Sequence, residues 1–316
     1  MRVCLMIEGQ EGVTWEDWLR LAGLAEERGL DGLFRSDHYT AIVRPQADAL
    51  DAWTTLAGLA ALTERIRLGT LVSPATFRHP SVLARMAVTV DHISLGRVDV
   101  GMGSGWYERE HVAHGFPFPD GKRRFELFAE QVEIVVRSWT EEGFDHEGAA
   151  YELREQTALP RPFQQPHPPL VLGGGNVRPR FAALAARYAS EVNTLGAPND
   201  ELRARKERLD RACAEAGRDP ASLAFSVMTS CFVGEDETEA LERVRVFLAV
   251  RGDDTDPAEV VAERRDRWLV GSVDEVAARV ESLRDLGVSR VFLQHLNHGD
   301  DEMVELVARR LLPALV

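Results

Sequence analysis

The sequence predicts an α/β fold, a single (β/α)8 TIM barrel with insertions, and two observations lead to it. Short β-rich runs alternate with amphipathic stretches from one end of the 316 residues to the other, which is the pattern of right-handed βαβ units on a parallel sheet. The β-rich runs number eight, and eight units favour a closed barrel over an open doubly wound sheet. The length also suits one α/β barrel.

Each expected strand is a short β-rich run that ends at a turn. In chain order the strands are expected at residues 2–8 (RVCLMIE), 31–36 (DGLFRS), 66–72 (IRLGTLV), 97–102 (RVDVGM), 169–173 (PLVLG), 190–195 (SEVNTL), 223–233 (LAFSVMTSCFV) and 290–294 (RVFLQ). The helices are expected at about 14–28, 50–63, 80–92, 123–140, 178–188, 199–216, 236–250, 273–286 and 300–312.

The helix at 273–286 shows the helical pattern most fully. Ser272 and Glu275 have the spacing of a capping box at its start, and Gly287 is suited to end it. Its apolar residues recur along one face, at Val273, Val276, Ala277, Val280 and Leu283.

Two stretches interrupt the alternation, and neither has the character of a second domain. Residues 144–170 are rich in proline around a possible small hairpin, and residues 251–270 are rich in charge. With no repeat, low-complexity tract or linker in the sequence, we expect one domain over residues 1–316 with insertions at about 144–170 and 251–270.

Composition excludes several classes of function. The 37 basic and 51 acidic residues give a net charge of −14, which argues against binding to nucleic acid or to anionic membranes. Three separate cysteines without a CxxC motif signal neither a disulfide framework nor a zinc ribbon. No signal peptide and no uncharged apolar segment of 18 residues are found, so we expect a soluble, cytoplasmic protein.

Active sites of such barrels lie at the carboxyl ends of the strands, and the sequence places polar, glycine-rich and aromatic groups there. The clearest is the turn Gly173, Gly174, Gly175 and Asn176, where a strand runs into glycines and then a helix. Backbone N–H groups there could hold an anion, with Arg178 and Arg180 close by. A flexible turn remains the alternative, because the spacing is neither a GxGxxG motif nor a Walker motif.

The second strand ends in Asp37 and His38. An imidazole beside a carboxylate suits acid–base catalysis near neutral pH, although both could be ordinary loop residues. The histidines lack an HExxH pattern, so no metal site is predicted, and no GxSxG motif supports a serine hydrolase.

The fourth strand runs into Gly103 and Gly105, where a planar ring could approach the backbone or the chain could merely turn. Trp106 and Tyr107 follow and could form an aromatic wall or part of the core. Glu8 ends the first expected strand and His295 follows the eighth, and we expect these two with Trp106 and Tyr107 to contact substrate.

Six segments resemble the bacterial luciferase-like flavin/deazaflavin oxidoreductases, in that family's order and nearly end to end. They are GLFRSDHY, ERIRLGTLVSPATFRHP, GRVDVGMGSGWYEREHVAHGFPF, RRFELFAEQVEIV, PPLVLGGG and VGSVDEVAARVESLRDLGVSRVFLQ. The family fold is a (β/α)8 barrel with insertions, which agrees with the count of strands.

The SDH and GWYERE segments resemble the branch that uses coenzyme F420, a deazaflavin. The resemblance implies that His38 is an acid–base group, that Asp37 lies beside the deazaflavin, and that the turn at Gly173–Asn176 holds the cofactor phosphate. It also implies a non-prolyl cis peptide at Leu71-Val72 behind the central ring. The expected catalytic residues are therefore His38 and Asp37. The expected cofactor site consists of Leu71, Val72, Gly103, Gly105, Gly173, Gly174, Gly175 and Asn176.

One position departs from this branch. Where its sugar-phosphate dehydrogenases have a glutamate after the glycine turn, this chain has Trp106, which suggests a flatter, more apolar substrate. The main hypothesis is an F420-dependent oxidoreductase that transfers hydride to or from a small organic substrate. The alternatives are an FMNH2-dependent monooxygenase supplied by a partner flavin reductase, and a barrel that binds flavin without catalysis. Family resemblance further implies a homodimer and a possible flavin or F420 reductase partner.

Overall fold

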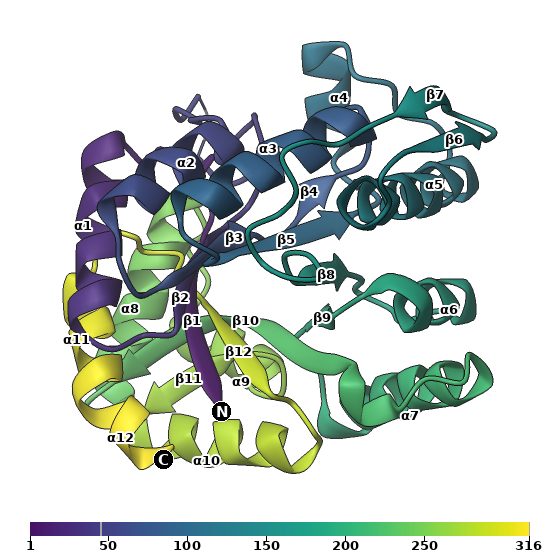
Figure 1. Cartoon of the computed structure of the whole chain (residues 1–316). Coiled ribbons are helices and arrows are strands. Elements are labelled where there is room, and N and C mark those ends of the chain that lie inside the picture. The colour runs from purple at the N-terminus through teal and green to yellow at the C-terminus, as the bar shows by residue number, and fades with distance from the viewer. Residues whose placement is uncertain (45, 316) are drawn as a thin grey trace.

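The computed structural model describes residues 1–44 and 46–315, and in it eight parallel strands close a barrel (Figure 1). Around the barrel the order is β1, β2, β3, β5, β8, β9, β10 and β12, and β12 pairs again with β1. Their bounds are Arg2–Ile7, Gly32–Arg35, Arg67–Thr70, Val98–Gly103, Leu170–Gly173, Glu191–Leu195, Ala224–Gly234 and Arg290–Gln294. Each of the eight expected strands is present, so the prediction of a TIM barrel is confirmed.

Helices pack around the outside of this barrel (Figure 1). Those expected from the sequence are α1 (Trp15–Glu27), α2 (Ala52–Leu62), α3 (Pro80–Ile93), α5 (Gly121–Thr140), α6 (Pro179–Tyr188), α7 (Asn199–Glu215), α8 (Glu237–Val250), α10 (Val273–Asp285) and α11 (Asp301–Leu306). After α11 the chain continues through a π-helical turn, η2 (Val307–Leu311), into α12 (Leu312–Ala314). The capping box of Ser272 and Glu275 is formed, and Gly287 follows the end of α10 with a φ of +84°.

Several short elements were not expected. They are β4 (Ser73–Pro74), α4 (Glu108–His114), the short helix η1 (Pro220–Ser222), α9 (Pro257–Arg264) and β11 (Leu269–Ser272), which pairs with the distal half of β10. The possible hairpin in the proline-rich stretch exists, as β6 (Phe144–Glu147) against β7 (Glu152–Gln156). Short elements of this kind carry too few residues to show a period in sequence.

The interior of the barrel has an apolar middle. Side chains alternate along each strand, so one set points inward while the other set packs beneath the helices. The inward set forms one buried cluster of Cys4, Met6, Phe34, Leu71, Val171 and Phe292, against which Val72 and Met228 pack. The rings of Phe34 and Phe292 meet edge to face at 4.8 Å, which fills the centre and leaves the two ends to polar residues.

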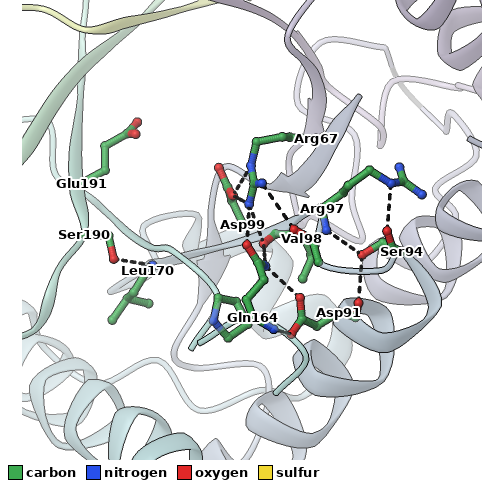
Figure 2. A network of polar contacts seen from close by, with 12 residues as sticks. Arg67, Asp91, Ser94, Arg97, Val98, Asp99, Gln164, Leu170, Ser190 and Glu191 are labelled. Carbon is green, nitrogen blue, oxygen red and sulfur yellow. Dashed lines mark hydrogen bonds and ion pairs between the residues drawn. The ribbon is translucent and has the colours of Figure 1, made fainter. Parts of the chain in front are cut away.

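The amino-terminal end of the barrel is closed by paired charges. Arg290, 1% exposed, donates to Asp99 at 2.6 Å and to both carboxylate oxygens of Glu191 at 2.6 and 3.0 Å. Figure 2 shows Arg67 reaching Asp99 and Gln164 on the same side of the molecule. Burial alone would lower the pKa of Arg290, but the neighbouring carboxylates outweigh it and raise that pKa. These charges therefore satisfy one another within the chain.

Candidate active site

The carboxyl ends of β2 and β5 bring three of the expected site residues together. His38 lies three residues beyond β2, while Trp106 and Tyr107 lie just beyond β5. The imidazole of His38 is 5.9 Å from the Trp106 ring and 6.3 Å from the Tyr107 ring, in both cases edge to face. Trp106 is 62% exposed, so its ring lines an open rim rather than the core.

His38 is held by a carboxylate that sequence reasoning missed. Its Nδ1 lies 2.8 Å from Oε2 of Glu110, a residue of α4 that is fully buried. The other oxygen of Glu110 accepts the backbone N–H groups of Tyr39 and Thr40. One carboxylate therefore fixes both the imidazole and the chain that follows it.

This pair sets the charge of both groups. Burial alone would lower the pKa of His38, but the hydrogen bond and the charge of Glu110, with smaller effects of Glu8 and Asp37, outweigh it and raise that pKa above its ordinary value of 6.5. Burial alone would raise the pKa of Glu110, and the hydrogen bonds from His38 and the two amides lower it instead. The pair thus favours the imidazolium beside a carboxylate more than an isolated histidine and glutamate would.

The other ring nitrogen of His38 is left open. Because Glu110 accepts from Nδ1, Nε2 is the nitrogen that can gain or lose a proton toward a ligand. Within the described part of the chain Nε2 has no hydrogen-bond partner, and it is not among the fully buried polar atoms without one. The arrangement has the form of a general acid–base with its orienting carboxylate.

Asp37 points away from His38, as expected for neighbours on an extended chain. Its carboxylate accepts from Ser73 at 2.6 Å and from Arg78 at 2.6 and 3.1 Å, and it is 1% exposed. Arg78 also reaches Tyr39 and Asp51, so it joins the end of β2 to the start of α2. This role of Arg78 was not predicted from the sequence. The structure does not test a catalytic role for Asp37, which stays a prediction.

The expected cis peptide at Leu71-Val72 is present. The side chain of Val72 lies between the backbones of Gly103 and Gly173: a Cβ on Gly103 would come within 2.6 Å of Val72 Cγ2, and a Cβ on Gly173 within 2.9 Å of Val72 Cγ1. Glycine is therefore needed at both positions for Val72 to occupy this place at the barrel mouth. The residues named from sequence as a cofactor site, Leu71, Val72, Gly103 and Gly173, thus adjoin one another.

The glycine turn after β8 differs in one respect from the expectation. The N–H of Gly174 donates to the carbonyl of Asn193 at 3.0 Å, so it is already used. The amides of Gly175 and Asn176 make no hydrogen bond within residues 1–44 and 46–315, and both residues are exposed. The start of α6, with Arg178 at its N-cap, likewise has no side-chain cap. The amides of Gly175 and Asn176 therefore remain for an anion, and that of Gly174 does not.

The fold itself requires glycine at position 105. Its φ is +79°, and a Cβ there would lie 2.8 Å from the hydroxyl oxygen of Thr76. That hydroxyl is in turn 2.6 Å from Nε2 of the buried His111. Gly105 therefore allows the chain to turn between β5 and α4, and a direct contact with the cofactor stays a prediction.

Glu8 and His295 line one small cavity of about 10 Å³ together with Phe247 of α8. The carboxylate of Glu8 accepts from Gln10 at 3.0 Å and from Gln294 at 2.5 Å. His295 directly follows Gln294, and successive side chains on an extended chain point to opposite faces of the sheet. His295 therefore points to the other face of the barrel wall from Gln294. It is buried, its Nε2 has no partner among the described residues, and burial lowers its pKa to about 4. The structure does not bring His295 to His38, although strand alternation could have predicted its direction.

Metal clusters and membrane-spanning helices are both absent from residues 1–44 and 46–315. None of their histidine, cysteine, aspartate and glutamate side chains gather in groups of three or more suited to a metal ion. None of their helices is both long and apolar enough to cross a membrane.

Comparison with known proteins assigns the family. A family model described as luciferase-like monooxygenase matches residues 2–290. A protein named F420-dependent glucose-6-phosphate dehydrogenase from Microbacterium testaceum is 29% identical, covering 92% of this chain and 91% of that relative. A relative of the same name from Kineococcus radiotolerans is 30% identical over 92% of this chain and 90% of its own.

Solved structures of similar fold also match this chain. The crystal structure of monooxygenase RslO1 from Streptomyces bottropensis has a TM-score of 0.84 and 28% identity over the whole of both chains. An F420-dependent secondary alcohol dehydrogenase, at 20% identity and a TM-score of 0.83 over 100% of this chain and 99% of its own, shares the fold. Together with the barrel already described, these matches show that the chain is an oxidoreductase that belongs to the luciferase-like monooxygenase family.

Proposed function

We propose that this protein is an F420-dependent oxidoreductase in which hydride passes between the deazaflavin and a small organic substrate, with His38 moving the accompanying proton. The observation that carries the proposal is the His38–Glu110 pair, which leaves Nε2 of His38 open at the mouth of the barrel. Relatives named for F420-dependent dehydrogenation cover more than nine-tenths of the chain, which supports the choice of cofactor.

The residues at the mouth fit a phosphorylated, planar cofactor. The amides of Gly175 and Asn176 are free to receive a phosphate at the start of α6. Val72, partly buried against the inner cluster and flanked by Gly103 and Gly173, offers an apolar surface for a ring. Trp106 and Tyr107 supply aromatic rings beside His38.

When bound, the deazaflavin would supply or accept a hydride. The chain then has to manage one proton. Because the pKa of His38 is raised, its imidazolium form is stabilised, and Nε2–H of that form can donate to a substrate atom that becomes basic. In the reverse direction the neutral imidazole can take the proton back at the same nitrogen.

Glu110 makes this exchange possible at one defined atom. As a buried acceptor for Nδ1, it keeps the proton on that side of the ring, and its charge stabilises the imidazolium. Asp37 positions His38, because its hydrogen bonds with Ser73 and Arg78 fix the end of β2 from which His38 projects.

An FMNH2-dependent monooxygenase is the second candidate. The specific observation in its favour is RslO1, named a monooxygenase, which matches the whole chain at 28% identity. The same amides and the same apolar surface would suit FMN. This candidate needs a separate flavin reductase, whereas the first needs none for the half-reaction with substrate. A homodimer is part of both proposals.

The test is a fluorescence titration of the purified protein with F420 and with FMN. We expect F420 to bind at least ten times more tightly than FMN, a difference of about 1.4 kcal/mol or more. Gly175→Val serves as a site control, because it should weaken binding of either ligand at the same turn. Tighter binding of FMN, lost in the same control, would overturn the first candidate in favour of the second.

A further inference from the structure

Three cations meet around one carboxylate beside the glycine turn. Lys122 and Arg123 begin α5, and Arg180 begins α6. Their charged groups lie 4.0, 3.6 and 4.0 Å from the carboxylate of Glu126. These separations exceed hydrogen-bond length, so Glu126 gathers the cations without using up their N–H groups.

The local charge is opposite to that of the protein. Segments 119–126 and 176–181 together hold five Lys or Arg residues and two carboxylates, whereas the whole chain carries −14. Of the two carboxylates, Asp120 is occupied by the backbone amides of Lys122 and Arg123. The side chains of Lys122 and Arg180 are 78% and 63% exposed. An excess of accessible positive charge on an acidic protein favours an anionic ligand at that place.

Aromatic rings link this cluster to the glycine turn. A Cβ on Gly174 would touch the ring of Phe181 at 2.8 Å. Phe181 stacks with Phe128 at 6.4 Å, and Phe128 meets Phe125 at 6.2 Å. The guanidinium of Arg180 lies over Phe125, 5.0 Å from its ring centre. Arg180 is thus held at a set position relative to the turn.

The free amides of the glycine turn and the cation Arg180 are also close along the chain. The N–H of Arg178 donates to the carbonyl of Asn176, and Arg180 follows two residues later. A ligand whose first anionic group binds at the free amides of Gly175 and Asn176 therefore lies one turn of chain before Arg180, the cation that shares Glu126 with Lys122 and Arg123.

We propose that Lys122, Arg123 and Arg180 form a second anion subsite, which binds the carboxylates that follow the phosphate of the deazaflavin cofactor. This rests on the proposed function, because F420 carries such a carboxylate tail and FMN ends at its phosphate. The subsite would then contribute to the preference for F420 over FMN without touching the reacting ring.

The experiment compares the double variant Lys122→Gln/Arg180→Gln with wild type. Arg123 is left in place because it also donates to the carbonyl of Ala149. The matched control is Arg245→Gln/Arg309→Gln, which removes two exposed cations from other surfaces. Fluorescence titrations measure the Kd of F420 and of FMN at low and at high salt.

We expect the double variant to raise the Kd of F420 about tenfold at low salt, and to reduce its dependence on salt, since salt screens exposed charges. The Kd of FMN and both values for the control variant should change less than about twofold. An unchanged Kd of F420, or an equal loss for F420 and FMN, would overturn the subsite while leaving the proposed function intact. If wild-type protein failed to bind F420 at all, the proposed function and the subsite would both be wrong.

Discussion

The two ends of the barrel differ in whether their polar groups are paired. At the amino-terminal end Arg290, Asp99 and Glu191 are buried and bonded to one another. At the carboxyl end His38 has one buried partner and one free nitrogen, and the amides of Gly175 and Asn176 have no partner within the described residues. Charges satisfied within the chain contribute to the stability and specificity of the fold, while groups left open at the other end remain available for chemistry.

The largest expected effect concerns the open end. His38→Ala removes the group that donates or accepts the proton, so kcat should fall by about 10²–10⁴-fold. The Kd of F420 should stay within a few-fold, because the phosphate amides and the Val72 surface are untouched. Stopped-flow oxidation of the reduced deazaflavin by substrate, across pH 5–9, measures the rate. A native rate with a native pH profile would show that the open end lacks its acid–base group.

The next effect concerns the closed end. Arg290→Met removes the buried cation that Asp99 and Glu191 share, and leaves Asp99 with Arg67 and Glu191 with the more distant Arg2. This should cost up to about 3–5 kcal/mol of unfolding free energy. Urea denaturation measures this loss, with Arg245→Met at an exposed ion pair as the control, for which we expect little change. The folded fraction of Arg290→Met should bind F420 normally. If stability were retained but F420 binding lost, the division between the two ends would fail.

A smaller effect separates the two glycines of the turn. A Cβ on Gly175 would meet no atom within 4 Å and the backbone there has no positive φ, whereas a Cβ on Gly174 would meet the ring of Phe181. Gly175→Val should therefore leave the melting temperature unchanged and raise the Kd of F420 about tenfold, roughly 1.4 kcal/mol. Gly174→Val should lower the melting temperature instead. Unchanged affinity in Gly175→Val would move the phosphate to another place.

Sequence reasoning reached the fold because the barrel repeats one pattern eight times. Periodicity located the strands and the long helices, and the capping residues Ser272 and Glu275 were readable directly. Helix α4 was not predicted, because its seven residues, EREHVAH, span only about two turns and have no side-chain cap.

The site was predicted in part for a related reason. Positions at strand ends, such as His38 and Trp106, follow from the fold class. Glu110 reaches His38 across 72 residues of sequence, and the amide of Gly174 is used by Asn193 of the next strand. Contacts of that kind depend on how elements pack, and no local pattern of residues encodes them.

At the open end, Glu110 sets the protonation of His38. A ¹⁵N NMR titration of the histidine rings measures this effect, with His38→Asn used to assign the signal. In wild type we expect the pKa of His38 to lie above 6.5, since the carboxylate outweighs burial. In Glu110→Gln burial should dominate, and that pKa should fall below 6.5. A wild-type value at or below 6.5, or the same value in both proteins, would contradict the account.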